Sequence, residues 1–321
     1  MDRRLKYKPV ILGVLAACLL AACASAPQAP TPTRTPASTA TSSAVILTDG
    51  LGKQFVIAKP YQKIVSLAPS NTEILFAIGA GEQVVARDAS SDYPAQVKSL
   101  SDIGGGLNAF NNEQIVALAP DLVLAAEINA PEQIKALQDL GLNVFYLANP
   151  KDFNGLYANL TTVAQLTGRQ AETDALIASL KTRVAAVESK VANATTHPKV
   201  FYELDGTDPS APWTSGPGTF IDLLAKEAGG TNVGNMLNKD WGQLSLEQLV
   251  TQNPDMIVLG DAVWGNIKPE DVAKRAGWDA LTAVKTGKVY PFDDNLISRP
   301  GPRLVDGLEQ LAKLLHPDLF Q

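Results

Sequence analysis

Aromatic side chains in loops are the residues of this sequence whose type and surroundings suggest a chemical task. They occur in polar stretches rich in glycine and proline, where strands are expected to end or helices to begin: Tyr93, Trp213, Trp241 and Trp264. A single loop aromatic often only covers the core, whereas several around a cleft would form flat apolar walls for a large ligand. The segment Arg-Pro-Gly-Pro-Arg adds two guanidinium groups, Arg299 and Arg303. These either support loop structure or bind amide or carboxylate groups of a ligand.

Catalytic chemistry has little support in the sequence. His197 and His316 both lie beside prolines at expected element ends, with no cysteine or nucleophile motif near them. The segments 104–106 and 216–218 are rich in glycine, but they lack the lysine and the spacing of a phosphate-binding loop. Without enough histidine or cysteine, a transition-metal site is not expected either. We therefore expect no enzyme, no catalytic residues and no metal or cofactor of the protein's own.

One pattern occurs twice, at residues 113–124 and 247–258. Each copy begins with Glu-Gln and two apolar residues, and each leads at the same spacing to Pro-Asp and an apolar run. In both copies an N-cap residue precedes the glutamine by three positions, as Asn111–Gln114 and Ser245–Gln248. The repetition predicts two lobes of similar construction.

The glutamates of the repeat, Glu113 and Glu247, have two interpretations. Because the glutamines take part in capping, both carboxylates remain free in the first helical turn, where the helix dipole favours them. They are then either ordinary first-turn acids, or a matched pair that marks the same surface on each lobe for a partner. Pro120 and Pro254 are expected to end the two helices.

Residues 1–23 have the features of an export signal. A basic head is followed by an apolar run, Pro9–Ala22, that is too short to span a bilayer comfortably. Small residues then precede Cys23, which resembles a bacterial lipoprotein signal whose cysteine is lipidated. The four letters that end at Cys23, Leu-Ala-Ala-Cys, also occur at Leu15–Cys18, but the apolar run before Cys18 is shorter, so we expect lipidation at Cys23. A plain membrane anchor or an uncleaved helix is the alternative.

Residues 24–44 are almost all Ala, Pro, Thr and Ser, with one charge, which is typical of a solvated, disordered tether. Both cysteines of the chain lie in the signal, so the folded part has no disulfide. Removing residues 1–22 takes away four basic side chains and one acidic side chain, which changes the formal net charge from −6 to −9. An acidic domain argues against nucleic acid as a partner, and against a polyanionic ligand held by charge alone.

Strands alternate with helices in the two expected lobes, residues 45–150 and 198–321. In the first lobe, a hairpin over 45–56 precedes strands near 64–67, 84–86, 122–125 and 144–147, separated by helices near 69–77, 113–118 and 131–139. In the second lobe, strands are expected near 199–204, 256–259 and 288–291, with helices near 219–227 and 303–315. This order predicts an α/β fold with two Rossmann-like lobes and mainly parallel sheets.

Residues 151–197 interrupt the alternation. Apolar side chains recur every three to four residues from Leu176 to Val191, which predicts one long helix over about 171–194. Such a helix could bridge the two lobes, and a rigid connection of this kind predicts modest lobe movement.

With these features in view, the chain resembles the substrate-binding lipoproteins of ABC importers that carry cobalamin, haem and ferric siderophores, the class III periplasmic binding proteins. The resemblance covers residues 45–318. The motifs that carry it are Ile64–Glu73, Ser91–Pro94, Glu113–Asp121, Trp213–Gly216, Trp241–Glu247 and Arg299–Arg303.

The resemblance is strongest to the cobalamin binders and implies roles for particular residues. The positions that face the corrin in that group correspond to Tyr93, Trp213 and Trp241; Pro69 and Arg299 complete the ligand-binding set that we expect. The family also implies that Glu113 and Glu247 dock against arginines on two copies of a membrane permease. The sequence departs from the cobalamin binders at one point: they have a tryptophan shortly before the glutamate of the first lobe, here Glu113, whereas residues 102–107 contain none.

The expected function is an extracytoplasmic, lipid-anchored receptor that captures a corrinoid between two lobes and delivers it to an ABC permease. Cobalamin is the corrinoid that we expect. Haem or a ferric siderophore is the alternative ligand, with Tyr93 as the axial ligand in the case of haem. An extracytoplasmic enzyme is the alternative outside this class. We expect a monomer.

Overall fold

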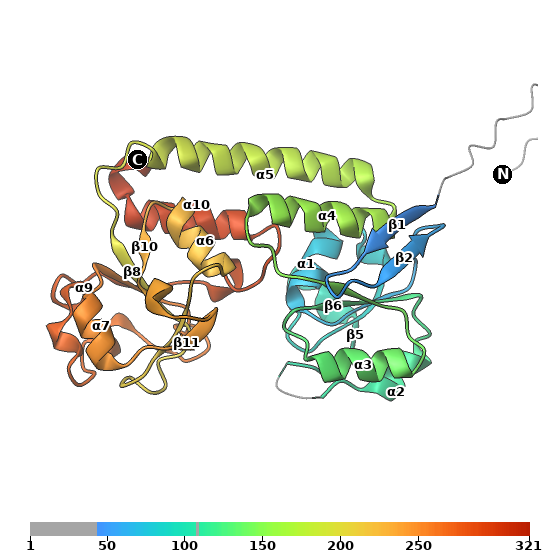
Figure 1. Cartoon of the computed structure of the whole chain (residues 1–321), viewed down its shortest axis with the longest axis horizontal. Helices are drawn as coiled ribbons and strands as arrows, with labels where there is room; N and C mark the ends of the chain where they lie inside the picture. The colour runs from blue at the N-terminus through green and yellow to red at the C-terminus, as the bar shows by residue number, and fades with distance from the viewer. Residues whose placement is uncertain (1–43, 107–108) are drawn as a thin grey trace, which may run out of the picture. The chain divides into compact units, whose positions relative to one another are not determined.

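The structure, a computed structural model, describes residues 44–106 and 109–321 (Figure 1). The predicted signal with Cys23, and the tether up to residue 43, lie outside the described residues. Among the residues described, no helix combines the length and apolar character needed to cross a membrane.

A five-stranded parallel sheet forms the centre of the first lobe, in the order β5-β4-β3-β6-β7. Its strands are β3 (Ile64–Ser66), β4 (Val84–Arg87), β5 (Ser101–Asp102), β6 (Leu122–Ala126) and β7 (Val144–Leu147). Its helices are α1 (Pro69–Ala77), α2 (Asn112–Ala117) and α3 (Pro131–Asp139). The predicted hairpin is present as the antiparallel pair β1 (Val45–Thr48) and β2 (Gln54–Ile57).

A four-stranded parallel sheet, in the order β10-β8-β12-β13, forms the centre of the second lobe. Its strands are β8 (Lys199–Glu203), β10 (Thr231–Asn232), β12 (Met256–Leu259) and β13 (Val289–Pro291). The helices are α6 (Phe220–Glu227), α7 (Leu246–Gln252), α8 (Pro269–Val272), α9 (Thr282–Lys285) and α10 (Leu304–Leu315). A separate antiparallel pair, β9 (Trp213–Ser215) and β11 (Trp241–Gln243), was not predicted.

Short 3-10 helices complete the chain at Gly81–Gln83, Ala95–Ser99, Val233–Met236, Trp278–Ala280, Asp294–Leu296 and Pro317–Phe320. The prediction of an α/β fold with two mainly parallel sheets is confirmed.

The repeated pattern forms the same unit in both sheets, namely α2 with β6 and α7 with β12. β6 runs parallel to β3 and to β7, and β12 runs parallel to β8 and to β13. Asn111 Oδ1 and Ser245 Oγ accept hydrogen bonds from the backbone N–H of Gln114 and Gln248, at 3.0 and 3.2 Å. Local capping therefore follows the sequence pattern.

The aspartate of each Pro-Asp pair connects the repeat to the neighbouring strand. The Asp121 carboxylate accepts from the backbone N–H groups of Gln62 and Lys63, at 2.8 Å each. Asp255 accepts from the N–H of Lys199 at 2.8 Å. Each aspartate therefore binds the backbone at the start of a parallel strand, β3 or β8, which explains why Pro-Asp recurs.

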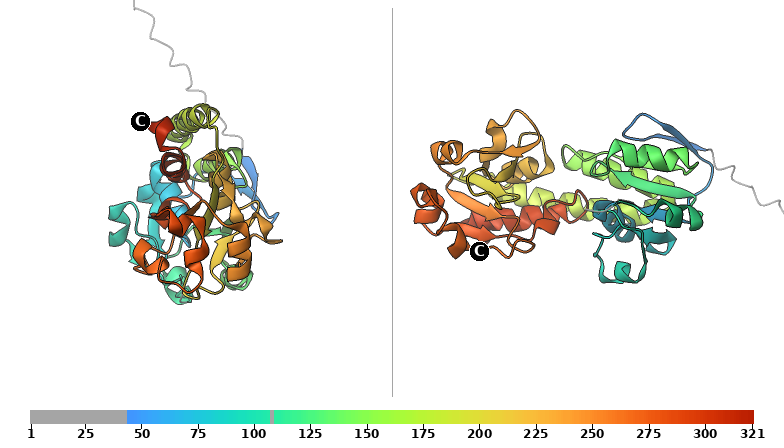
Figure 2. Two further views of the ribbon diagram at one scale, coloured as in Figure 1. Left: turned by 90° about the vertical axis from the view of Figure 1, so that its left-hand side faces the viewer. Right: turned by 90° about the horizontal axis from the view of Figure 1, so that it is seen from below.

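Two helices lie between the sheets in the sequence, α4 (Phe153–Thr167) and α5 (Gln170–Val191). The predicted apolar stripe of α5 is buried at Leu180, Val184 and Val187. α5 packs against α4, α6 and α10, so it extends along both lobes (Figures 1 and 2). Its buried residues share one continuous core with the strands of both sheets. This confirms the single bridging helix, with α4 as an addition to it.

Candidate functional site

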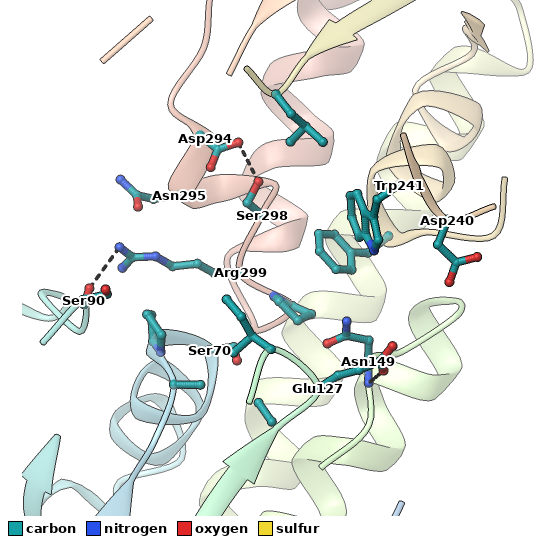
Figure 3. Close-up of a pocket in the computed structure, with 17 residues that line it drawn as sticks. Ser70, Ser90, Glu127, Asn149, Asp240, Trp241, Asp294, Asn295, Ser298 and Arg299 are labelled. Atoms are coloured by element: carbon teal, nitrogen blue, oxygen red, sulfur yellow. Dashed lines mark hydrogen bonds between the residues drawn. The ribbon is translucent and has the colours of Figure 1, made fainter. Parts of the chain in front are cut away.

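A cavity of about 690 Å³ is lined by residues of both lobes (Figure 3). Its apolar lining consists of Ala68, Pro69, Ala126, Ile128, Leu204, Phe220, Trp241 and Pro300. Its polar lining consists of Ser70, Ser90, Glu127, Asn149, Asp240, Asp294, Asn295, Ser298 and Arg299. The volume and the mixed lining are typical of a site for an organic ligand.

Most of the lining follows the carboxyl ends of parallel strands. Residues 68–70 come after β3, residues 126–128 extend from the end of β6, and Leu204 directly follows β8. Residues 294–300 follow β13. Loops at this edge of parallel sheets are where open α/β folds bind ligands. The topology therefore brings these loops together, although they are far apart in the sequence.

Trp241 and Phe220 form the aromatic part of the wall. Their ring centroids are 5.5 Å apart and the planes are inclined by 55°. Trp241 stands on β11 opposite Ser215, while Phe220 begins α6 behind the Thr219 cap. Phe220 is buried and Trp241 is 36% exposed, so the indole offers a free face to a ligand. A partly exposed ring on a buried aromatic base can gain apolar contact when a flat molecule enters.

Of the five predicted ligand-binding residues, Pro69, Trp241 and Arg299 line this cavity. Tyr93 lines a second cavity of about 310 Å³, where the Arg303 guanidinium lies 4.1 Å from the centre of its ring. Trp213 is 41% exposed at the start of β9 and lines neither cavity. Ligand contact by these five residues remains a prediction.

Arg299 is engaged by two carboxylates. Its Nη1 lies 3.0 Å from Glu73 Oε1 and 2.7 Å from Asp92 Oδ1, and its Nη2 donates to the carbonyl of Ser90 at 3.4 Å. Arg303 binds the same Glu73 carboxylate through Nε and Nη2, at 2.7 and 2.6 Å. The arginine motif of the second lobe is thus ion-paired to α1 of the first.

Asp294 is a partly buried acid of the cavity. Its Oδ1 accepts a hydrogen bond from Tyr202 Oη at 2.7 Å. It also accepts one from Ser298 Oγ at 2.5 Å (Figure 3). Burial raises the pKa of Asp294, against the opposing effect of these two hydroxyl donors. Burial and the nearby Asp294 also hold the pKa of Tyr202 well above its ordinary value. Tyr202 therefore stays a hydrogen-bond donor at neutral pH.

The repeat glutamates lie away from the cavity. Glu113 and Glu247 are exposed in the first turns of α2 and α7. Neither forms an ion pair with any residue that the structure describes. Their equivalent positions follow from the repeated α2/β6 and α7/β12 units, and nothing in the local packing uses the two carboxylates.

The histidines take part in local structure. His197 Nδ1 and His316 Nε2 lie 3.0 and 3.4 Å from the same carbonyl oxygen, that of Gly229. In residues 44–106 and 109–321, no group of three or more His, Cys, Asp or Glu side chains could hold a metal ion.

Several lining residues were not recognised in the sequence, among them Glu127, Asn149, Phe220, Asp240 and Asp294. A positional signal was available for Glu127, which directly follows the strand of the first repeat. Phe220 and Asp240 carry no such signal, because the antiparallel β9–β11 pair that brings this region to the cavity was itself unpredicted.

Comparison with known proteins identifies the family. The model of the family described as periplasmic binding protein matches residues 64–296. The chain is 34% identical to a Bacillus subtilis (strain 168) protein named uncharacterized ABC transporter substrate-binding lipoprotein YvrC, with 86% of this chain and 87% of that protein covered. It is 29% identical to a protein of Halobacterium salinarum named cobalamin-binding protein, with 97% and 85% covered.

A solved structure with the same fold is that of a protein named for another ligand. The periplasmic heme-binding protein RhuT of Roseiflexus sp. RS-1, in apo form, is 27% identical and superimposes with a TM-score of 0.72, covering 81% of this chain and 99% of that one. The chain therefore belongs to the periplasmic binding protein family. It is an extracytoplasmic substrate-binding protein of the ABC-transporter type, in the group whose members bind vitamin B12, haem and siderophores. This family consists of transport proteins that bind substrates, not of enzymes.

Proposed function

We propose that this protein is a lipid-anchored receptor that captures a corrinoid in the cavity between its lobes and delivers it to an ABC permease. The observation that carries the proposal is the exposed face of Trp241 on its Phe220 base, with prolines and aliphatic side chains in the remaining apolar part of the wall. Such a wall suits a large flat macrocycle. The relative named cobalamin-binding protein supports a corrinoid.

A haem remains the second candidate, because a solved relative is a haem-binding protein. Two observations argue against haem. Tyr93, the expected axial ligand, lines the second cavity, where the Arg303 guanidinium packs over its ring. The single guanidinium on the wall of the larger cavity, Arg299, already has two carboxylate partners. A dianionic porphyrin would therefore find little free positive charge there.

Titration calorimetry with cyanocobalamin and with haemin tests the proposal. We expect the wild-type protein to bind cyanocobalamin, and Trp241→Ala to weaken this binding about tenfold or more, because it removes the exposed aromatic wall. Trp264→Ala is the matched control, since Trp264 is also exposed but does not line the cavity. Absence of binding to any corrinoid would contradict the proposal, and tight binding of haemin alone would favour the second candidate.

Delivery requires a contact with the permease, for which Glu113 and Glu247 are the proposed docking groups. Changing both to alanine should leave corrinoid affinity unchanged and abolish uptake of labelled corrinoid by cells, because both carboxylates are exposed and neither residue lines the cavity. The control is Glu132→Ala with Glu270→Ala, which also removes one exposed first-turn acid from each lobe. Loss of affinity with uptake intact would reverse the assigned role.

The anchor is proposed at Cys23. The mass of the mature N-terminal peptide, isolated from membranes, should show a lipid on this cysteine; an unmodified peptide, or one that starts at Cys18, would contradict this.

A further inference from the structure

A polar corner lies at the Trp241 end of the cavity. It consists of Glu127, Asn149 and Asp240 (Figure 3). The same three residues line a small adjoining hollow whose other members include Lys151, Phe220 and Trp241, so they are neighbours of the aromatic wall. Glu127 and Asn149 follow the strands β6 and β7 of the first lobe, whereas Asp240 immediately precedes β11 of the second. We call these three residues the polar corner. A ligand on the exposed face of Trp241 would therefore contact polar side chains from both lobes.

The two carboxylates of the polar corner keep free acceptor capacity. Glu127 Oε2 accepts one hydrogen bond, from the backbone N–H of Asn149 at 2.8 Å. Within the described residues, Glu127 forms no ion pair. Asp240 has Lys151 at 3.8 Å, but both side chains are more than half exposed, and such a pair is weak. Each ionised carboxylate offers about four lone-pair positions, so most of them remain open to a ligand.

The balance of charge along the cavity is acidic. Its charged lining consists of Glu127, Asp240, Asp294 and Arg299. The positive charge of Arg299 is met by Glu73, whose side chain is 1% exposed, and by Asp92. Because like charges repel and a carboxylate cannot donate a hydrogen bond, an anionic substituent would be unfavourable at the polar corner. A group that carries N–H donors would be favourable there.

We propose, on the basis of the corrinoid function proposed above, that Glu127 and Asp240 are specificity-determining residues that select a flat ligand edged with primary amides and reject one edged with carboxylates. A primary amide supplies two N–H donors, and a hydrogen bond to an ionised acceptor is about twice as strong as one between neutral groups. Asn149 completes the corner, because its own amide can either donate to or accept from the ligand amide. The macrocycle lies on Trp241 while its amide edge reaches the two acids.

The test compares two corrinoids that differ only at the edge: dicyanocobinamide, which has primary amides, and the same macrocycle with those amides hydrolysed to carboxylates. The wild-type protein should bind the amide form at least tenfold more tightly in low salt. The difference should shrink as salt increases, because exposed charges are screened. In Glu127→Gln with Asp240→Asn, the ratio of the two affinities should fall by about tenfold. Both side chains are exposed, so the isosteric changes should leave the melting temperature unchanged.

The matched control is Glu132→Gln, which makes the same change on an exposed first-turn acid outside the cavity and should keep the wild-type ratio. Equal binding of the two corrinoids by the wild-type protein would overturn the inference while leaving the corrinoid function standing. An unchanged ratio in the double variant would also overturn it, since the preference would then come from other residues. If neither corrinoid binds, the proposed function fails and the inference fails with it.

Discussion

Replacing Glu73 with glutamine should lower the free energy of unfolding by about 3–5 kcal/mol, the usual effect of removing one partner from a buried ion pair. The Glu73 side chain is 1% exposed, and its carboxylate accepts three hydrogen bonds from Arg299 and Arg303. The two guanidinium groups are themselves only 14% and 15% exposed. A glutamine would place an N–H₂ group against these donors, which would take from Arg303 its carboxylate partner and leave Arg299 with Asp92 alone.

Urea unfolding followed by circular dichroism measures this change. Glu82→Gln is the matched control, because Glu82 is an exposed acid of the same lobe without an ion pair among the described residues, and it should change stability by less than about 0.5 kcal/mol. Replacing both Glu73 and Arg303 with apolar residues should recover part of the loss, since the charge and its partner then leave together. A loss below about 1 kcal/mol in Glu73→Gln would show that the network adds little to stability.

Glu203 should make the protein less stable as the pH rises. We expect its contribution to the free energy of unfolding to fall between about pH 4.5 and about pH 7. This residue ends β8, is fully buried, and forms an ion pair with Arg275 at 2.5 and 2.9 Å. Burial raises the pKa of Glu203 from 4.5 to about 7; Arg275 opposes the shift, and the neighbouring Asp261 adds to it. The direction agrees with the geometry, because two buried acids face one arginine.

The sign follows from proton binding. Between pH 4.5 and 7 the folded protein holds a proton on Glu203 that the unfolded chain releases, so raising the pH favours unfolding. Over the whole window the effect is about 3 kcal/mol, from 1.36 kcal/mol per pH unit. The contribution is fully present below pH 4.5 and is lost as the pH rises through 7.

Unfolding free energies of the wild type and of Glu203→Gln, measured at several pH values, isolate this component. The difference between the two curves removes the effects of other shifted acids, such as Asp294 and Asp92. We expect the wild type to lose stability relative to the variant as the pH increases. Parallel curves between pH 4.5 and 7 would show that Glu203 keeps an ordinary pKa in the folded protein.

Local sequence patterns were sufficient for most of the fold. The helix α1 has the predicted bounds, and α3 and β7 do as well. These elements depend on the spacing of apolar residues and on caps within a few positions, which are interactions between neighbours in the chain. The repeat predicted two related sheets for the same reason, because each copy contains a helix, its cap and the following buried strand. The β9–β11 pair was missed, because three-residue strands leave too short a pattern to recognise.

The candidate site could be predicted only in part. Of the residues that the motifs predicted as ligand contacts, Pro69, Trp241 and Arg299 line the cavity, whereas Tyr93 and Trp213 do not. The sequence does not distinguish a loop aromatic that faces a cavity from one that does not. Whether a ring faces a cavity depends on the strand that carries it and on what packs behind it, as Phe220 does behind Trp241.

The sequence by itself determined the order of elements, the two related sheets, the bridging helix and the acidic character of the chain. These follow from composition and from interactions between residues close in the chain. Only the tertiary structure decided which loops meet and which charges are already paired. Arg299 looked available for a ligand, yet it is paired with Glu73, which lies 226 residues away in the chain. Burial and pairing over such separations depend on how the sheets are brought together, and no local pattern records that.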